Sequence, residues 1–279
     1  MRADGKRLKG ADPMYQVAAH IMAKRSDAMN MITIDIPIEP MNKYLNEKRK
    51  EGKRYSHLSL IIAAYLQTMA EFPALNRFVV NKTIYARKEI AVGMVVLKGG
   101  KIDSPGTMSK LYLQPHYTLD DVQNTIEKYI NDNRAEENLN STDKFIKFIL
   151  SVPGLLRFGI ILFKFLDKYG LLPKKIIDIS PFHTSAVVTN LASIRTNHIY
   201  HHVYDFGTTS IALAMGNLRE IPVEKRGEVE FVRCMPIGMV MDERIASGSY
   251  FALAFRKFKK LLSDPSQLET PPEKIVKDI

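Results

Sequence analysis

The stretch LIIAAYLQTMAEFPALNRFVVNKTIYARKEIAVGMVV, residues 60–96, changes its periodicity in the middle and decides the fold class. Apolar side chains first repeat at helical spacing, until Pro73 ends the helix. The residues that follow predict a strand, a turn at Asn81 and Lys82, and a longer strand rich in β-branched side chains. A core helix that leads directly into a hairpin indicates a mixed α and β domain.

The segments on either side continue this mixture of strands and helices. ITIDIPI, residues 32–38, alternates apolar and polar positions as a half-buried strand does, with Pro37 on an edge or at the strand end. Residues 118–133 predict an amphipathic helix with Thr118 as its N-cap. The last third of the chain returns to strands and closes with a helix that Ser247 caps.

The 279 residues are 46% hydrophobic and 25% charged, the composition of an ordinary globular protein. We expect one α/β domain at 13–262, with a flexible, solvated basic arm at 1–12 and a C-terminal tail at 263–279. A helical insertion is expected at about 141–175. The single cysteine, Cys234, excludes an intramolecular disulfide and a metal site built from several thiolates, which fits a reducing, cytoplasmic setting.

The net charge of +10 is concentrated in one apolar segment. Residues 144–175 hold seven Lys or Arg against one Asp, without the interleaved basic and aromatic residues that read bases. We therefore expect no nucleic-acid partner, and interpret this segment as facing anionic ligands or lipid headgroups. Its apolar runs are interrupted at Pro153, Arg157 and Lys164, so none reaches the roughly 20 residues that span a bilayer.

Three further stretches carry a resemblance to a known family. EFPALN (71–76) with the hairpin after it, AVVTNLASI (186–194) and GEVEFVRCMPIGMVMDERIASG (227–248) resemble the acyltransferase catalytic domain of 2-oxoacid dehydrogenase complexes, a relative of chloramphenicol acetyltransferase. The resemblance covers roughly residues 12–262. It implies a chloramphenicol acetyltransferase-like two-layer α/β sandwich with a mixed sheet and flanking helices, assembled as a homotrimer.

The resemblance also implies the chemistry. The family transfers an acyl group between coenzyme A and a second acceptor at the interface between subunits. A histidine in an Asp-His-Arg turn acts as general base, and a Ser or Thr hydroxyl of the facing subunit stabilises the oxyanion. In this chain Asp242, Arg244 and Thr189 match the pattern, whereas Glu243 stands for the histidine and Ser247 for a later aspartate.

Three interpretations of Glu243 are open. The base is lost and Glu243 pairs with a neighbouring arginine, or Glu243 is a substitute base that burial must strengthen, because glutamate is ordinarily the weaker base by about two pKa units. In the third, the base lies among His198, His201 and His202, since His201 and Asp205 repeat the His-x-x-x-Asp spacing of the family turn. No second ligand cluster supports a metal site at these histidines.

The expected ligands are coenzyme A or acyl-coenzyme A as substrate, with a small-molecule acyl donor and acceptor. STDKF, residues 141–145, resembles a lipoyl-attachment site only superficially, because Lys144 stands where a capped helix starts. We therefore expect no covalently bound lipoyl group on this chain. The acyltransferase activity either uses an atypical base or is lost.

The alternative function is a non-catalytic trimeric scaffold or binding protein. Residues 144–175 predict two short helices hinged at 152–155, which pack within the trimer, cover a long acyl chain, or contact a membrane surface or partner protein. An enzyme requires Glu243 or one of the three histidines to face an open channel near Thr189 of the adjacent subunit. A scaffold predicts a plugged channel or a salt-bridged Glu243.

Overall fold

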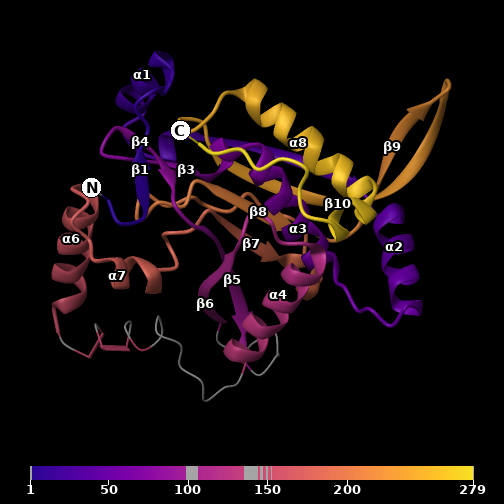
Figure 1. Cartoon of the computed structure of the whole chain (residues 1–279), viewed down its shortest axis with the longest axis horizontal. Helices are drawn as coiled ribbons and strands as arrows, with labels where there is room; N and C mark the ends of the chain where they lie inside the picture. The colour runs from indigo at the N-terminus through magenta and orange to yellow at the C-terminus, as the bar shows by residue number, and fades with distance from the viewer. Residues whose placement is uncertain are drawn as a thin grey trace.

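A seven-stranded mixed sheet forms the centre of the computed structural model, with the strand order β2-β10-β8-β7-β5-β6 and with β9 paired to β10 (Figure 1). The structure describes residues 2–98, 106–134, 144, 147–148, 150–151 and 153–278. Part of the expected insertion, including the predicted hinge residue Val152, lies outside the described residues. The pairs β5–β7 and β7–β8 are parallel and the other pairs of this sheet are antiparallel.

The strands of the large sheet are β2 (Met29–Pro37), β5 (Ile90–Leu97), β6 (Gly106–Leu113), β7 (Ala186–Asn190), β8 (Ile211–Met215), β9 (Arg219–Lys225) and β10 (Glu228–Asp242). A smaller sheet joins β1 (Gly5–Arg7), β4 (Thr83–Arg87) and β3 (Arg77–Val80). The helices are α1 (Pro13–Ile21), α2 (Ile38–Lys50), α3 (His57–Glu71), α4 (Leu119–Arg134), α6 (Leu155–Lys168), α7 (Lys174–Ile179) and α8 (Gly248–Ser263). Short 3-10 helices lie at Ser26–Ala28, Pro73–Asn76, Leu191–Ile194 and Pro265–Glu269.

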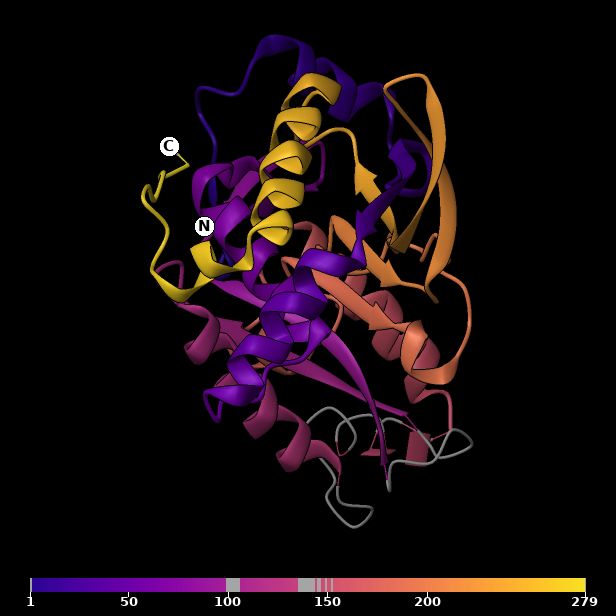
Figure 2. The same cartoon turned by 90° about the vertical axis from the view of Figure 1, so that its right-hand side faces the viewer.

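One face of the large sheet carries the hydrophobic core. Helices α3, α4 and α8 pack there, with α8 crossing in front of the sheet in Figure 2. Helix α3 is buried from Ser59 to Ala70 and lies at the centre of this layer. From the strands, this core contains Ile34, Ile36, Val92, Met94, Val188, Leu213, Ile237 and Met239. The expected two-layer α/β sandwich with a mixed sheet is therefore confirmed.

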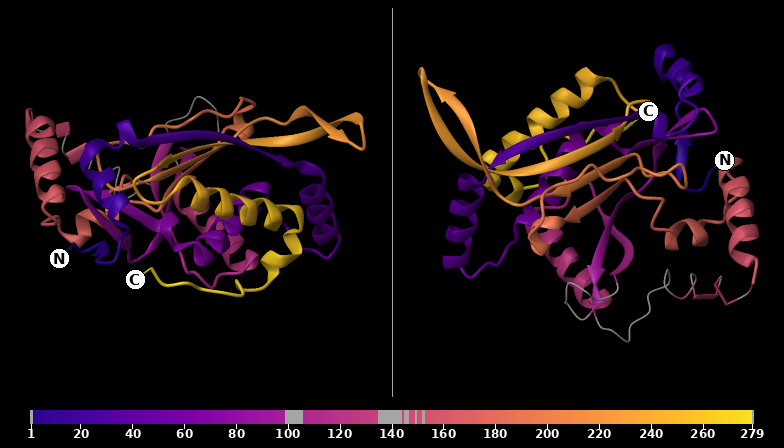
Figure 3. Two further views of the ribbon diagram at one scale, coloured as in Figure 1. Left: turned by 90° about the horizontal axis from the view of Figure 1, so that it is seen from above. Right: turned by 180° about the vertical axis from the view of Figure 1, so that it is seen from behind.

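The opposite face of the sheet is crossed by the extended segment 196–206, seen from behind in Figure 3. This segment lies so close to the strands that side chains would not fit beneath it. A Cβ atom on Gly216 would lie 2.2 Å from the backbone nitrogen of His198, and one on Gly238 would lie 2.3 Å from the carbonyl oxygen of Ile199. Glycine at both positions is thus what allows the segment to lie flat on the sheet.

Two local expectations need correction. The residues predicted as one long strand after Lys82 form β4 and β5 in different sheets, because residues 88–89 bend the chain between them. Ile38, expected to end a strand, instead begins α2, whose buried side chains Met41, Tyr44 and Leu45 follow helical spacing.

The expectation of a flexible, solvated arm at residues 1–12 is wrong. Strand β1 pairs with β4, and Arg2 is buried. The Arg2 guanidinium donates to Asp4 Oδ1 over 2.9 Å and to Asp167 Oδ1 over 2.6 Å, so this arginine is paired with carboxylates inside the fold. The C-terminal residues 263–278 also pack on the body, where Leu268 is buried and Asp278 accepts two hydrogen bonds from Arg77.

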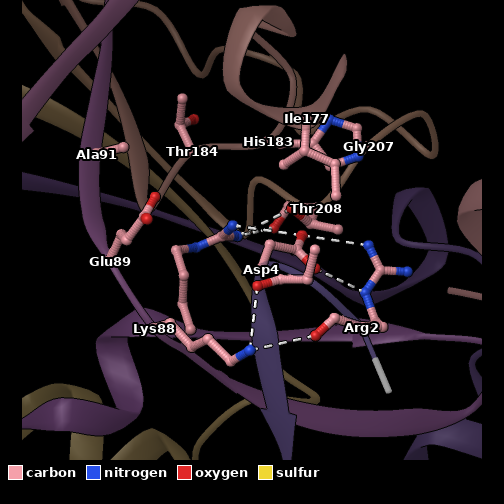
Figure 4. A network of polar contacts seen from close by, with 12 residues as sticks. Arg2, Asp4, Lys88, Glu89, Ala91, Ile177, His183, Thr184, Gly207 and Thr208 are labelled. Atoms are coloured by element: carbon pink, nitrogen blue, oxygen red, sulfur yellow. Dashed lines mark hydrogen bonds and ion pairs between the residues drawn. The ribbon is translucent and has the colours of Figure 1, made fainter. Parts of the chain in front are cut away.

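A buried polar network surrounds Arg2 and holds α6 to the body (Figure 4). His183 lies with Nε2 3.3 Å from Asp167 Oδ1, and its Nδ1 is 2.8 Å from Ser180 Oγ. Burial lowers the pKa of His183, with Asp167 opposing the shift. Burial alone would raise the pKa of Asp167, but His183 and Arg2 outweigh it and hold that pKa below its ordinary value. The network therefore favours a neutral imidazole beside an ionised carboxylate.

Replacing His183 with glutamine should flatten the pH dependence of stability below pH 6.5. Because the folded-state pKa of His183 lies below the ordinary 6.5, the unfolded chain binds the proton first, and stability falls as the pH drops through this window. The slope is at most about 1.4 kcal/mol per pH unit for one proton. Burial lowers the pKa of Lys110 to about 7, so this lysine affects stability mainly above the window.

Urea unfolding of both proteins at a series of pH values measures these slopes. If the unfolding free energy changes with pH at the same slope in the wild type and in the His183→Gln variant, the prediction is contradicted. This holds even if one protein is more stable at every pH.

Gly238→Ala should destabilise the chain by about 1–3 kcal/mol, because the added methyl group collides with the backbone of segment 196–206. Urea unfolding gives the free energy, and the imidazole signals of His198 in NMR report whether the segment has moved. Gly248→Ala is the matched control, since a Cβ there meets no atom within 4 Å. Equal effects of the two substitutions would show that the close approach is unimportant.

Candidate functional site

Asp242, the last residue of β10, is the hub of the turn that resembles the family's catalytic motif. Its side chain is fully buried. Its Oδ1 accepts hydrogen bonds from the backbone nitrogen and Nε of Arg244, and its Oδ2 accepts from Arg244 Nη2 over 2.7 Å. Arg25 Nε lies 3.3 Å from the same Oδ2. One carboxylate therefore holds two buried guanidinium groups.

Arg25 joins the turn to three other parts of the chain. It donates to the carbonyl oxygens of Val79 in β3, of Tyr204 and of Gly207. Burial lowers the pKa of Arg25, and Asp242 partly offsets this effect. No local pattern in the sequence singled out Arg25, because its partner in the turn is 217 residues away.

Glu243 is half-buried, and hydrogen bonds hold both its backbone and its side chain. Its backbone nitrogen donates to the carbonyl oxygen of Ala28, and its Oε2 accepts a 2.6 Å hydrogen bond from Asn30 Nδ2 in β2. Within the described ranges Glu243 has no ion pair, and the neighbouring Arg25 and Arg244 both bind Asp242. The carboxylate of Glu243 is thus oriented by an amide and not neutralised by a cation.

Ser247, at the position of the family's later aspartate, has a structural role in this chain. It is the N-cap of α8, and its hydroxyl accepts a hydrogen bond from the backbone nitrogen of Tyr250. The predicted cap is confirmed, and the turn passes directly into a stable helix.

Thr189 and Glu243 are not brought together within one chain. In the sheet, Thr189 of β7 pairs with Ala214 of β8, and Ala214 pairs with Gly238 of β10. Glu243 lies five residues beyond Gly238, which is about 16 Å along a strand. A site that uses both side chains therefore needs a second copy of the chain.

The three candidate histidines lie on segment 196–206. His198 Nε2 is 2.9 Å from Thr33 Oγ1, and burial lowers the pKa of His198. Its ring lies over Gly238, in the row of the sheet that also contains Thr189. Among the three histidines, His198 is therefore the one whose described contacts place it in that row.

His201 and Asp205 do not form the pair that their spacing suggested. Asp205 Oδ1 instead accepts hydrogen bonds from the backbone nitrogens of Arg25 and Ser26, while His201 Nδ1 lies 3.0 Å from the carbonyl oxygen of His202. The described residues contain no group of three or more side chains suited to a metal ion.

A hollow of about 620 Å³ lies beside the turn. Arg25 and Arg244 form part of its wall next to Phe163 of α6 and Phe206, whose rings stack with centroids 4.7 Å apart. The wall also includes four lysines, namely Lys24, Lys82, Lys164 and Lys168, and the acidic residues Asp167 and Asp205. This hollow could not be predicted from the sequence, because its lysines come from three separate segments of the chain.

This chain is similar to known proteins in part of its sequence and in its fold. Residues 184–270 match the family model of the 2-oxoacid dehydrogenases acyltransferase (catalytic domain), a range that includes Thr189 and the Asp242 turn. None of the curated proteins compared with the sequence matches it.

Solved structures share the fold at low sequence identity. A probable dihydrolipoamide acetyltransferase from Listeria monocytogenes 4b F2365 is 12% identical with a TM-score of 0.57, covering 92% of this chain and 94% of that one. The cubic core of the pyruvate dehydrogenase multienzyme complex is 11% identical, TM-score 0.59, covering 91% and 88%. A chloramphenicol acetyltransferase is 12% identical, TM-score 0.56, covering 92% and 99%. The family model thus covers about a third of the chain, and the solved structures share its fold.

Proposed function

We propose that this chain forms a homotrimer in which Thr189 of one subunit faces Glu243 of the next, and that coenzyme A or an acyl thioester binds between them. The observation that carries the proposal is the buried Asp242 hub, which fixes the position of Glu243 at the end of the sheet opposite to Thr189. Side chains at least about 16 Å apart within a chain act together only across an interface.

The proposed reaction is transfer of an acyl group from coenzyme A to a second thiol or hydroxyl. Glu243 takes the proton of the incoming nucleophile and returns it to the leaving thiolate. The hydroxyl of Thr189 donates a hydrogen bond to the oxyanion of the tetrahedral intermediate. The Asn30 amide holds the Glu243 carboxylate in one orientation, which a general base requires.

The absence of an ion pair to Glu243 within the described ranges favours the catalytic alternative over the scaffold. A carboxylate locked to an arginine is a poor base, because the cation stabilises its ionised form. Here the guanidinium groups of Arg25 and Arg244 bind Asp242, and the side-chain partner of Glu243 is the neutral amide of Asn30.

Binding is tested by thermal unfolding of the purified protein with coenzyme A, acetyl-coenzyme A and a longer acyl thioester. Ligand at 100 times its dissociation constant should add about 2.7 kcal/mol of stability. A saturable rise in Tm supports the proposal. A folded, trimeric protein that shows no shift with any of the three ligands would contradict it.

Glu243→Gln and Thr189→Val should each lower acyl transfer by at least about a hundredfold, since each removes one of the two proposed catalytic groups. Loss of the acetyl-coenzyme A thioester, with dihydrolipoamide as acceptor, measures the rate. Glu228→Gln, an exposed carboxylate at the start of β10, is the matched control and should leave the rate unchanged.

Mixing the two inactive variants provides the sharper test. Every trimer that contains both variants has one interface with an intact Thr189 and an intact Glu243. Random reassembly therefore restores about one quarter of the wild-type sites. Failure to regain activity in mixed trimers would contradict a site shared between subunits.

Asp242→Asn should destabilise the chain by about 3–5 kcal/mol, because it leaves two buried guanidinium groups without their carboxylate. Urea unfolding measures the change. Asp35→Asn is the matched control, since Asp35 also binds an arginine in two hydrogen bonds but lies nearer the solvent, and about 1 kcal/mol or less is expected. Similar losses for the two variants would contradict the role of Asp242 as a hub.

A further inference from the structure

Helix α6 presents a broad apolar face to the solvent. It contacts the body along one seam, which includes Phe163 and the buried Asp167. On the outer side, five large apolar side chains are between 42% and 69% exposed: Phe158, Ile161, Leu162, Phe165 and Tyr169. Monomeric proteins rarely leave such a contiguous apolar surface uncovered, so this face needs an explanation.

A row of basic side chains borders the apolar face. Arg157, Lys164 and Lys168 are seven and four residues apart, which puts them side by side along one flank of the helix. Across the 620 Å³ hollow from Lys164 and Lys168 lie Lys24 and Lys82. In the part of the chain that the structure describes, none of these five side chains has an ion pair with an acidic group.

The acidic side chain of α6 does not offset this charge at the surface. Asp167 is buried and faces the body, where Arg2 and His183 hold it. The outer surface of α6 is therefore apolar in its centre and basic on one flank, which is the pattern of a helix that lies in a membrane interface.

We propose that α6 docks on an anionic membrane surface, with its apolar face at the boundary of headgroups and acyl chains and its basic flank at the lipid phosphates. With 14 residues the helix is too short to span a bilayer. None of the described helices is long and apolar enough to cross one. A second copy of a chain with net charge +10 would bring like charge to the basic flank, whereas anionic lipids bring the opposite charge.

Helix α1 supplies a second contact of the same kind. Met14, Val17 and Ile21 fall on one face of this helix, and each is about half exposed or more. Figures 1 and 3 show α1 and α6 at the same end of the molecule. Two anchoring helices at one end explain why the apolar side chains gather there.

Flotation with lipid vesicles tests the proposal and does not depend on any acyl transfer. The protein should float with vesicles of phosphatidylcholine mixed with phosphatidylserine and not with phosphatidylcholine alone. The double substitution Ile161→Glu and Phe165→Glu should weaken binding at least about tenfold, since it puts two charges into the apolar face. Phe231→Glu is the matched control, because Phe231 is 70% exposed on the β9–β10 hairpin and should not affect binding.

Substituting Lys164 and Lys168 with glutamine should weaken binding to the anionic vesicles roughly fivefold per lysine, and added salt should reduce the difference. Sedimentation of the same variants follows the oligomeric state. Two results would overturn the proposal. One is a folded wild-type protein that does not float with anionic vesicles. The other is an Ile161→Glu and Phe165→Glu variant that floats normally but loses its oligomeric state, which would make α6 a contact between copies.

Discussion

The buried carboxylate of Asp242 is the constraint on which the candidate site depends. It accepts hydrogen bonds from both Arg25 and Arg244, and Arg25 extends to β3 and to the segment 204–207. A guanidinium without a carboxylate is costly to bury, so these elements depend on Asp242 for their positions. Buried ion pairs therefore hold the turn that carries Glu243, although Glu243 itself departs from the family pattern.

Local signals explain which parts of the fold could be predicted. Helix α3 begins with a capping box between Ser56 and Ser59 and ends before Pro73, and all of these signals lie within the segment itself. The hairpin of β3 and β4 turns at Asn81 and Lys82, both with positive φ, and asparagine is favoured in such turns. These elements were predictable because the neighbouring residues alone determine them.

The features that could not be predicted depend on contacts between residues far apart in the sequence. The N-terminal segment looked solvated because it is basic and polar, but its partner Asp167 is 165 residues away. Arg25 and Asn30 belong to the candidate site through contacts with Asp242 and Glu243 that are more than 200 residues distant in sequence. Sequence periodicity cannot reveal such pairs, because the two residues come into contact only in the folded sheet.

The histidines show how spacing misleads when the fold is ignored. His201 and Asp205 repeat a catalytic spacing, yet Asp205 caps the chain at Arg25 and Ser26.

The contact that matters for His198 comes from Gly216 and Gly238, which let segment 196–206 lie against the sheet. Because glycine has no side chain at these two positions, the His198 imidazole can approach the row of the sheet that contains Thr189. No sequence motif indicates this contact.

Two buried networks of charged side chains also fix the candidate catalytic turn and the surface of α6 relative to each other. Asp242 holds the candidate catalytic turn, and Arg2 with Asp167 holds α6. The stacked rings of Phe163 and Phe206 join the two, because Phe206 directly precedes Gly207, whose carbonyl oxygen binds Arg25. A membrane in contact with α6 would thus lie at a fixed position beside the basic hollow and the turn.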